Sequence, residues 1–175
     1  METDRSAIAG LDERARPDAP AAAPSYTYEI YTDGSALVGA VPAGAKAEGP
    51  SGWAFRAVRS DGKMRDRSGG LAYSTNNRAE LTAAIEALAF LPEDRRGVVR
   101  ADSQYVVKGM TVWRAGWEAK GFKKVSNTDL WQQLYALADA RPGIRFEWVK
   151  GHSTNEHNNH VDRMARKAAL KMQKE

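Results

Sequence analysis

The chain has 175 residues, 42% hydrophobic and 27% charged, so it can form one domain with a sizeable apolar core. It contains no cysteine, which excludes disulfides, cysteine nucleophiles and thiolate zinc sites, and which suits a reducing compartment. The formal net charge is +4; residues 1–25 hold five acidic and three basic side chains, or −2, so the rest carries +6. This basic body indicates a polyanionic partner such as nucleic acid, although charge alone is as typical of a merely soluble basic protein.

Residues 1–25 are rich in alanine, proline and charged residues without steady periodicity, so we predict a disordered tail ahead of a domain spanning residues 26–175. No run approaches the roughly 18 apolar residues of a membrane span, and the N-terminus lacks the apolar core of a secretion signal. We therefore expect a cytoplasmic protein that does not bind membranes, and we expect a monomer.

The remaining elements are predicted from residue type and periodicity. Gly34–Gly52 is predicted as a loop, and Asp61-Gly62 as a hairpin turn. Strands are predicted at Tyr26–Thr32, Trp53–Arg59, from the hairpin to about Tyr73, at Val98–Ala101 and at Ile144–Val149. Helices are predicted at Asn77–Leu91, Ser103–Met110, Asn127–Ala140 and from Asn158 to about Lys174, with a basic and aromatic segment at Thr111–Lys124. The three initial strands predict an antiparallel meander. The two later strands each follow a helix, which predicts that they add to the sheet in parallel. Together these elements predict an α/β domain with a mixed sheet covered by helices.

Four carboxylates lie near the ends of these elements, and each has an ordinary structural explanation. Asp33 precedes a glycine, as in many turns. Glu80 lies three residues after Asn77, which is the spacing of a capping box. Asp102 separates a strand from a helix, where an N-cap is expected. Asp162 lies in the early turns of the last helix, where an acid complements the helix dipole.

The joint placement of the four acids is harder to explain in this way. Two of them end strands that could be parallel neighbours, two begin helices, and α/β sites usually form at the carboxyl ends of strands. Acids gathered there would repel one another unless cations were bound, and oxygen ligands suit Mg²⁺ or Mn²⁺. Two such ions about 3.5–4 Å apart can hold the attacking water and the leaving oxygen of a phosphodiester.

Five segments resemble those of type 1 ribonuclease H, in that family's order: YTDGS (Tyr31–Ser35), TNNRAEL (Thr75–Leu81), ADSQYV (Ala101–Val106), WVKGHS (Trp148–Ser153) and NNHVDRMARKAA (Asn158–Ala169). The resemblance implies a mixed five-stranded sheet with helices on both sides. It also implies an endonuclease that hydrolyses the RNA strand of RNA–DNA hybrids with two Mg²⁺ ions, or Mn²⁺ in their place. The products would carry 5′-phosphate and 3′-hydroxyl ends.

By this resemblance the four carboxylates hold the metal ions, and His152 assists proton transfer or product release. Outside its motif His152 would be an ordinary loop histidine, and with His157 and His160 it forms no standard zinc spacing, so we reject a zinc site. Residues implied to contact the hybrid are Gly34, Ser35, Thr75, Asn76, Asn77, Gln104, Trp113, Arg114, Trp117, Lys120 and Asn158.

Thr111–Lys124 resembles the family's basic protrusion, whose cations and aromatic side chains grip the DNA strand. At least one of its tryptophans, Trp113, is instead expected to be a core anchor. Two features depart from the family: the long Gly34–Gly52 loop, and Asn159 where a glutamate is common.

Two other functions compete with this interpretation. A related nuclease acting on DNA is disfavoured by the Thr75-Asn76-Asn77 motif, which resembles the family's contact with the hybrid. A non-catalytic hybrid-binding module is disfavoured because binding alone has no need of all four acids.

Overall fold

The computed structural model describes residues 26–175, so the tail predicted for residues 1–25 lies outside the described residues. Its elements are β1 (Thr27–Ala36), β2 (Gly49–Arg59), β3 (Met64–Ser74), α2 (Asn76–Phe90), β4 (Arg96–Ala101), α3 (Gln104–Lys108), the π-helical turn η1 (Gly109–Trp113), α4 (Arg114–Ala119), α5 (Thr128–Asp139), β5 (Ile144–Trp148) and α6 (Glu156–Lys174). No helix within residues 26–175 combines the length and apolar character needed to span a bilayer.

The five strands form one mixed sheet in the order β3-β2-β1-β4-β5. β1, β2 and β3 are antiparallel, whereas β4 pairs parallel to β1 and β5 parallel to β4, which confirms the predicted meander with parallel additions. In the β1–β4 register Thr32 lies opposite Ala101. Asp33, the next residue of β1, and Asp102, which follows β4, therefore lie at the same end of these two parallel strands.

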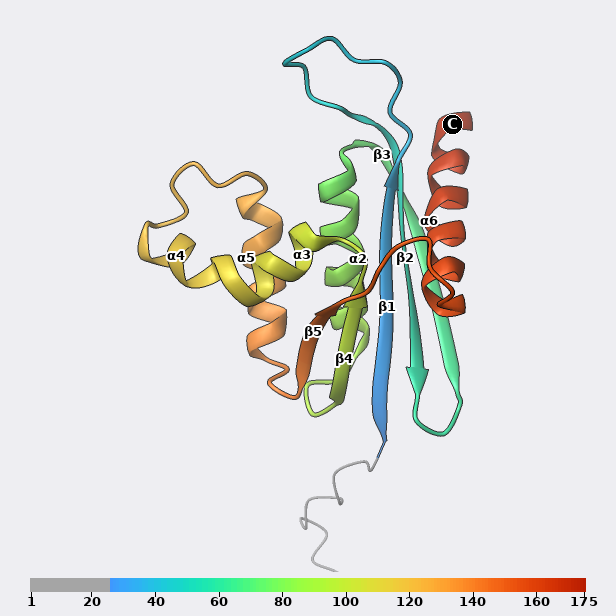
Figure 1. The fold of residues 1–175 in the computed structure, drawn as a ribbon, viewed down its shortest axis with the longest axis vertical. Helices are drawn as coiled ribbons and strands as arrows, with labels where there is room; N and C mark the ends of the chain where they lie inside the picture. The colour runs from blue at the N-terminus through green and yellow to red at the C-terminus, as the bar shows by residue number, and fades with distance from the viewer. Residues whose placement is uncertain (1–25) are drawn as a thin grey trace, which may run out of the picture.

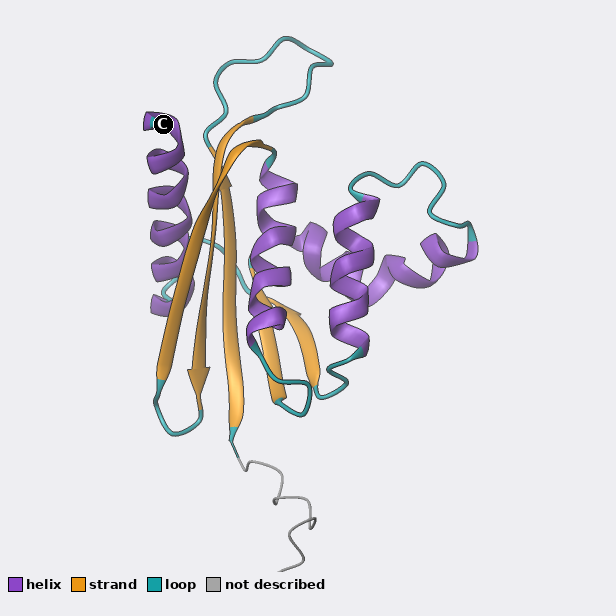
Figure 2. Ribbon diagram, turned by 180° about the vertical axis from the view of Figure 1, so that it is seen from behind, coloured by secondary structure: helices purple, strands orange, loops and turns teal. Residues whose placement is uncertain are grey.

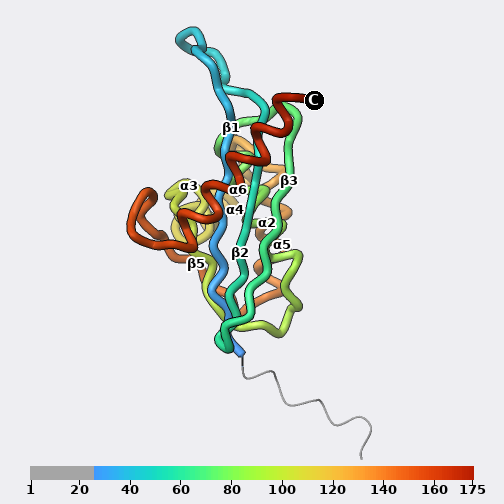
Figure 3. The backbone as a smooth tube through the Cα atoms, turned by 90° about the vertical axis from the view of Figure 1, so that its right-hand side faces the viewer, coloured from blue at the N-terminus to red at the C-terminus, as the bar shows by residue number. Residues whose placement is uncertain are grey.

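Helices cover both faces of the sheet (Figures 1 and 2). α2 packs on one face of β1 and β2 with α5 against it, whereas α6 lies across β1, β2 and β3 on the other face, as the turned view in Figure 3 also shows. The larger core lies on the α2 side and includes Phe55, Leu81 and Leu88, all fully buried. α6 approaches closely because Gly52 has no side chain: a Cβ there would lie 2.2 Å from the Ala165 carbonyl oxygen.

The prediction that Gly34–Gly52 is entirely loop was wrong, because both flanking strands continue into it. β1 runs on to Ala36, and Asp33 and Gly34 pair with Ala54 and Trp53 of β2, so the Asp-Gly pair is not a turn. Only residues 37–48 connect the strands, and this loop projects beyond the end of the sheet (Figure 1). The Asp61-Gly62 hairpin turn is confirmed, with Gly62 at a φ of +92°.

The expectation that Trp113 anchors the core was also wrong. The fully buried tryptophan is Trp131 of α5, whose indole N–H donates to the Tyr105 hydroxyl at 2.9 Å. Gly109 makes room for it, since a Cβ there would lie 1.9 Å from the indole ring. Trp113 is only half-buried and packs against Tyr105 and Trp117 at the edge of this cluster.

Candidate metal centre

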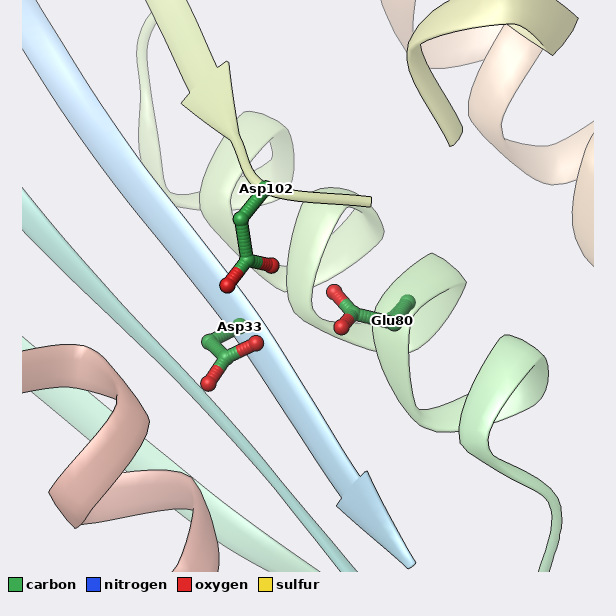
Figure 4. Close-up of side chains that lie close together, drawn as sticks. All are labelled: Asp33, Glu80 and Asp102. Carbon is green, nitrogen blue, oxygen red and sulfur yellow. The ribbon is translucent and has the colours of Figure 1, made fainter. Parts of the chain in front are cut away.

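Three of the predicted carboxylates converge at the sheet edge where β1 and β4 meet α2 (Figure 4). Asp33 comes from β1, Glu80 from α2, and Asp102 follows β4. One oxygen of each carboxylate lies within 4.8 Å of the other two. Glu80 is 47 positions after Asp33 and 22 before Asp102, so the fold brings together carboxylates that are far apart in the sequence.

None of the helix caps is made by the predicted acids or by Asn77. The Thr75 hydroxyl caps α2 by accepting from the Arg78 N–H at 3.1 Å, so the capping box that we considered for Asn77 and Glu80 is wrong. Ser103, not Asp102, caps α3 in the same way at 3.2 Å. α6 begins at Glu156 under an Asn155 cap, which leaves Asp162 beyond the first turn, where the dipole effect has largely faded.

Gly34 allows α2 to bring Glu80 against Asp33. A Cβ at Gly34 would lie 2.3 Å from the Glu80 backbone nitrogen and from the Ala79 carbonyl carbon, so a side chain there would push the helix away from β1. The sequence suggested a substrate contact for this glycine; in the structure its missing side chain sets the spacing of the carboxylates.

The carboxylates are held where their ionised forms are unfavourable. Burial raises the pKa of Asp33, which is only 4% exposed, and the charges of Glu80 and Asp102 raise it further. Burial followed by the charge of Asp102 raises the pKa of Glu80, and burial followed by the charge of Asp162 raises the pKa of Asp102. No arginine or lysine of the described residues forms an ion pair with these three acids.

The donor set fits a divalent cation. Glu80 Oε2 is buried without any hydrogen-bond partner, so the desolvation of this carboxylate oxygen is not compensated by a protein group. Asn158, 1% exposed, likewise has an unpartnered side-chain oxygen and lies beside Asp102, whose pKa it lowers. Carboxylate and amide oxygens are the ligands that Mg²⁺ and Mn²⁺ prefer, so an ion would satisfy these atoms and relieve the repulsion between the acids.

Asp162 and His152 border this group without belonging to it. Asp162 lies outside the cluster of three, but it hydrogen-bonds to Asp33 and so raises the pKa of that carboxyl. His152 is exposed on the loop before α6 at a φ of +52°, and its charge lowers the pKa of Asp102. The structure therefore brings all five predicted catalytic residues to one neighbourhood, three of them in direct convergence.

Two residues of the WVKGHS segment position Asp102, which sequence reasoning missed. The Trp148 indole N–H donates to the Asp102 backbone carbonyl at 3.1 Å. Gly151 lies so close that a Cβ would come within 2.9 Å of Asp102 Oδ2. Their motif was recognised in the sequence, but nothing in it indicated which carboxylate they touch.

The chain is similar to known proteins over most of its length. A profile of the RNase H family matches residues 25–170. Ribonuclease H of Caulobacter sp. (strain K31) is 44% identical over 147 residues, which cover 81% of this chain and 89% of that protein. Ribonuclease H of Pelobacter propionicus is 39% identical over 167 residues, covering 90% and 96%. The chain belongs to the ribonuclease H family.

Solved ribonucleases H1 share its fold. LC9-RNase H1, described as a type 1 RNase H with the type 2 active-site motif, superposes with a TM-score of 0.69 at 28% identity, covering 85% of this chain and 74% of that one. LC11-RNase H1, isolated from compost, gives 0.59 at 25% identity, with coverages of 84% and 98%. The recognition of type 1 ribonuclease H and the predicted mixed sheet flanked by helices are thus confirmed.

The predicted hybrid-contact residues of this ribonuclease H homologue differ in their surroundings. Thr75 is the α2 cap, and Asn76 Oδ1 accepts from the Ala36 N–H at 2.8 Å, so both have structural duties at the junction of β1 and α2. Asn77 and Gln104 are exposed near the carboxylates' end of the sheet, in the first turns of α2 and α3. Ser35 lies half-buried in β1, opposite Gly52.

The basic and aromatic segment forms an open hollow beside α3. Trp113, Trp117 and Lys120 line it, together with Tyr105, Ala119, Lys123, Lys124, Val125 and Ser126. Arg114 is not brought to this hollow: it donates to Asp139 at 2.6 Å, pairs with Glu118, and stacks over the Tyr135 ring. The segment therefore combines aromatic faces with three lysines, while its arginine joins α4 to α5.

Proposed function

We propose that the chain is an endonuclease that hydrolyses the RNA strand of RNA–DNA hybrids in a reaction requiring Mg²⁺, with Mn²⁺ able to substitute. The observation that carries this proposal is the convergence of Asp33, Glu80 and Asp102 from three elements around an unpartnered Glu80 oxygen, with Asp162 alongside. Membership of the ribonuclease H family supports the hybrid as substrate.

The four carboxylates would hold two ions. Asp33 interacts with Glu80, Asp102 and Asp162, so it would be a central ligand of this group. Bound divalent ions would lower the pKa of the attacking water and offset the charge that develops on the leaving 3′ oxygen. Because the 3′ oxygen is the leaving group, the phosphorus–O3′ bond would break and the products would carry 5′-phosphate and 3′-hydroxyl ends, with water and not the RNA 2′-hydroxyl as the nucleophile. The RNA 2′-hydroxyl serves recognition instead.

His152 would exchange a proton between the site and solvent. It is exposed and close enough to Asp102 to affect that carboxyl electrostatically, and imidazole is the side chain that titrates near neutral pH. Asn77 and Gln104 would contact the hybrid, and the hollow with Trp113, Trp117 and Lys120 would hold the DNA strand by its phosphates and sugars. Cytoplasmic location and a monomeric state stay predictions from the sequence.

The test is cleavage of an end-labelled RNA–DNA hybrid beside single-stranded RNA, double-stranded RNA and all-DNA duplex, with Mg²⁺, Mn²⁺ or EDTA. Only the hybrid should be cut, and only with a divalent ion. Asp102→Asn should fold normally and lose activity by about a hundredfold or more, because a ligand of the ions is lost. The isosteric control is Asp94→Asn, an exposed aspartate before β4 that should leave the rate unchanged. Cleavage by Asp102→Asn at the wild-type rate, or cutting of the all-DNA duplex, would refute the proposal.

A further inference from the structure

The outward face of α6 carries a continuous row of cations, here called the basic stripe: Arg163, Arg166, Lys167, Lys171 and Lys174. All five side chains are exposed. Their spacing along the helix places them opposite the buried Val161, Ala165, Ala168 and Ala169, which pack on the sheet. At 1.5 Å rise per residue the stripe extends over about 16 Å.

The charges of the basic stripe are uncompensated within residues 26–175. None of its five members takes part in an ion pair with another described residue. Arginines elsewhere on the surface differ: Arg56 pairs with Asp66, and Arg78 pairs with Asp129. A helix face of five unpaired cations is favourable for solubility alone, but it also attracts any polyanion that can lie along it.

A groove runs beside the stripe, between α6 and β3. Ser68, Gly69 and Gly70 form one wall, Lys167 and Lys171 stand on the other with Met164, Ala168 and Met172, Glu175 lies at its end, and the volume is about 460 Å³. β3 is one of the two edge strands, so its outer backbone groups pair with no further strand among residues 26–175. Figure 3 shows α6 and β3 side by side. The Met172 side chain packs against Gly70, so the β3 wall of the groove is formed by this methionine as well as by backbone.

We propose that this groove and the basic stripe bind a single strand of nucleic acid that continues beyond the hybrid. Phosphates would pair with the lysines and arginines, and sugars would rest on the two methionines. The groove can hold a sugar–phosphate chain but is too small for a duplex. The stripe begins at Arg163, directly after Asp162, so a strand leaving the metal centre can follow α6. That last point rests on the proposed function, whereas binding of single strands does not.

The groove has no aromatic lining, so we expect weak, sequence-independent and strongly salt-dependent binding. The measurement is the affinity, by fluorescence anisotropy in EDTA, for a blunt hybrid and for the same hybrid with a single-stranded extension at either end. Wild type should bind an extended hybrid more tightly than the blunt one. K167Q/K171Q/K174Q should lose this advantage, and the salt slope for extended hybrid should fall by about two units, at roughly 0.7 per phosphate contact on single strands.

Two further variants separate a binding site from bulk charge. K63Q/R65Q/R96Q removes the same charge from exposed side chains at the other end of the sheet and should keep the advantage. K167R/K171R/K174R restores charge on α6 and should bind as wild type. Circular dichroism confirms that each variant is folded.

An extension that gives wild type no advantage, or an equal advantage in K167Q/K171Q/K174Q, would overturn the inference. The inference would also be overturned if K167Q/K171Q/K174Q lost binding to phosphatidylserine vesicles but kept wild-type binding to oligonucleotides, because the basic stripe would then bind membranes. Hybrid cleavage without any advantage from the extension would refute only this inference. An advantage in a chain that cuts no hybrid would refute only the proposed function.

Discussion

The carboxylate cluster predicts that removing one charge stabilises the metal-free protein. With one oxygen of each group within 4.8 Å of the others, each pair of ionised groups repels by about 3.5 kcal/mol at an effective dielectric constant near 20. Three such pairs would cost about 10 kcal/mol, which is comparable with the whole stability of a domain. Without metal, the native state must therefore retain a proton on the cluster, and burial favours Asp33 as the group that holds it.

The free-energy cost of holding that proton sets the size of the stabilisation expected for Asp33→Asn. The unfolded carboxyl has a pKa of 3.8, so keeping it protonated at pH 7 costs the native state about 4 kcal/mol, at 1.36 kcal/mol per pH unit. Asp33→Asn has no charge to lose, and its amide can donate to Glu80 as the protonated acid does. It should stabilise the protein in EDTA at pH 7 by about 2–4 kcal/mol, or roughly 5–15 °C in Tm.

The sign of the pH dependence is fixed by the direction of the pKa shift. Because the folded pKa of Asp33 is raised, the unfolded chain releases its proton first as pH rises, so wild-type stability falls above about pH 4. The advantage of Asp33→Asn should therefore vanish near pH 4 and grow toward pH 7. Thermal and urea denaturation in EDTA between pH 4 and 8 measures this, with the exposed Glu93→Gln as the matched control.

Metal should narrow the difference in stability between Asp33→Asn and wild type. Mg²⁺ at a hundred times its dissociation constant should stabilise wild type by about 2.7 kcal/mol and leave Asp33→Asn almost unaffected. If Asp33→Asn is no more stable than wild type in EDTA at pH 7, or if its advantage is the same at pH 4, then the reasoning from clustered charge is wrong.

The remaining predictions concern packing around the site. Trp148→Phe loses the hydrogen bond to the Asp102 carbonyl and should weaken Mg²⁺ binding severalfold, about 1 kcal/mol, while Tm changes little; calorimetric titration checks the affinity. Gly109→Ala should destabilise by about 1–3 kcal/mol in urea denaturation, because its methyl group would overlap the Trp131 ring. Gly116→Ala, in a helix with open space around it, should instead stabilise by about 0.4–1 kcal/mol, and the reverse order of these two variants would contradict the packing described.

Much of the fold could be predicted because the strands and long helices have strong local patterns. The position of Asp33 could not, because Asp-Gly favours turns locally whereas pairing with Ala54 and Trp53 extends β1 through it. The identity of the caps was missed for a related reason. Thr75 and Asn77 are both suitable N-caps for α2, as Ser103 and Asp102 are for α3. Which residue caps the helix depends on where the preceding strand ends.

The candidate site was predicted as a set of residue types at strand and helix ends, but its geometry was not. Sequence could not show that Asp162 contacts Asp33 from outside the group of three converging carboxylates, or that Trp148 hydrogen-bonds to the backbone of Asp102. The expectation of a core anchor at Trp113 failed, and no role was predicted for Trp131, because only its packing against Gly109 shows that this indole is buried. These contacts join residues far apart in the sequence, so local sequence patterns do not predict them.

The partners of β1 are made at different times during synthesis, because β1 lies at the centre of the sheet. Its antiparallel partner β2 follows directly in the chain, but β4, which seats Asp102 beside Asp33, emerges only after α2, and α6 emerges last. A growing or truncated chain can thus build the hairpins of the meander while the acids are still scattered. Asp33, Glu80 and Asp102 can converge only once β4 has been made, and Asp162 joins them only when α6 has docked, so a chain that ends earlier lacks the complete set of acids.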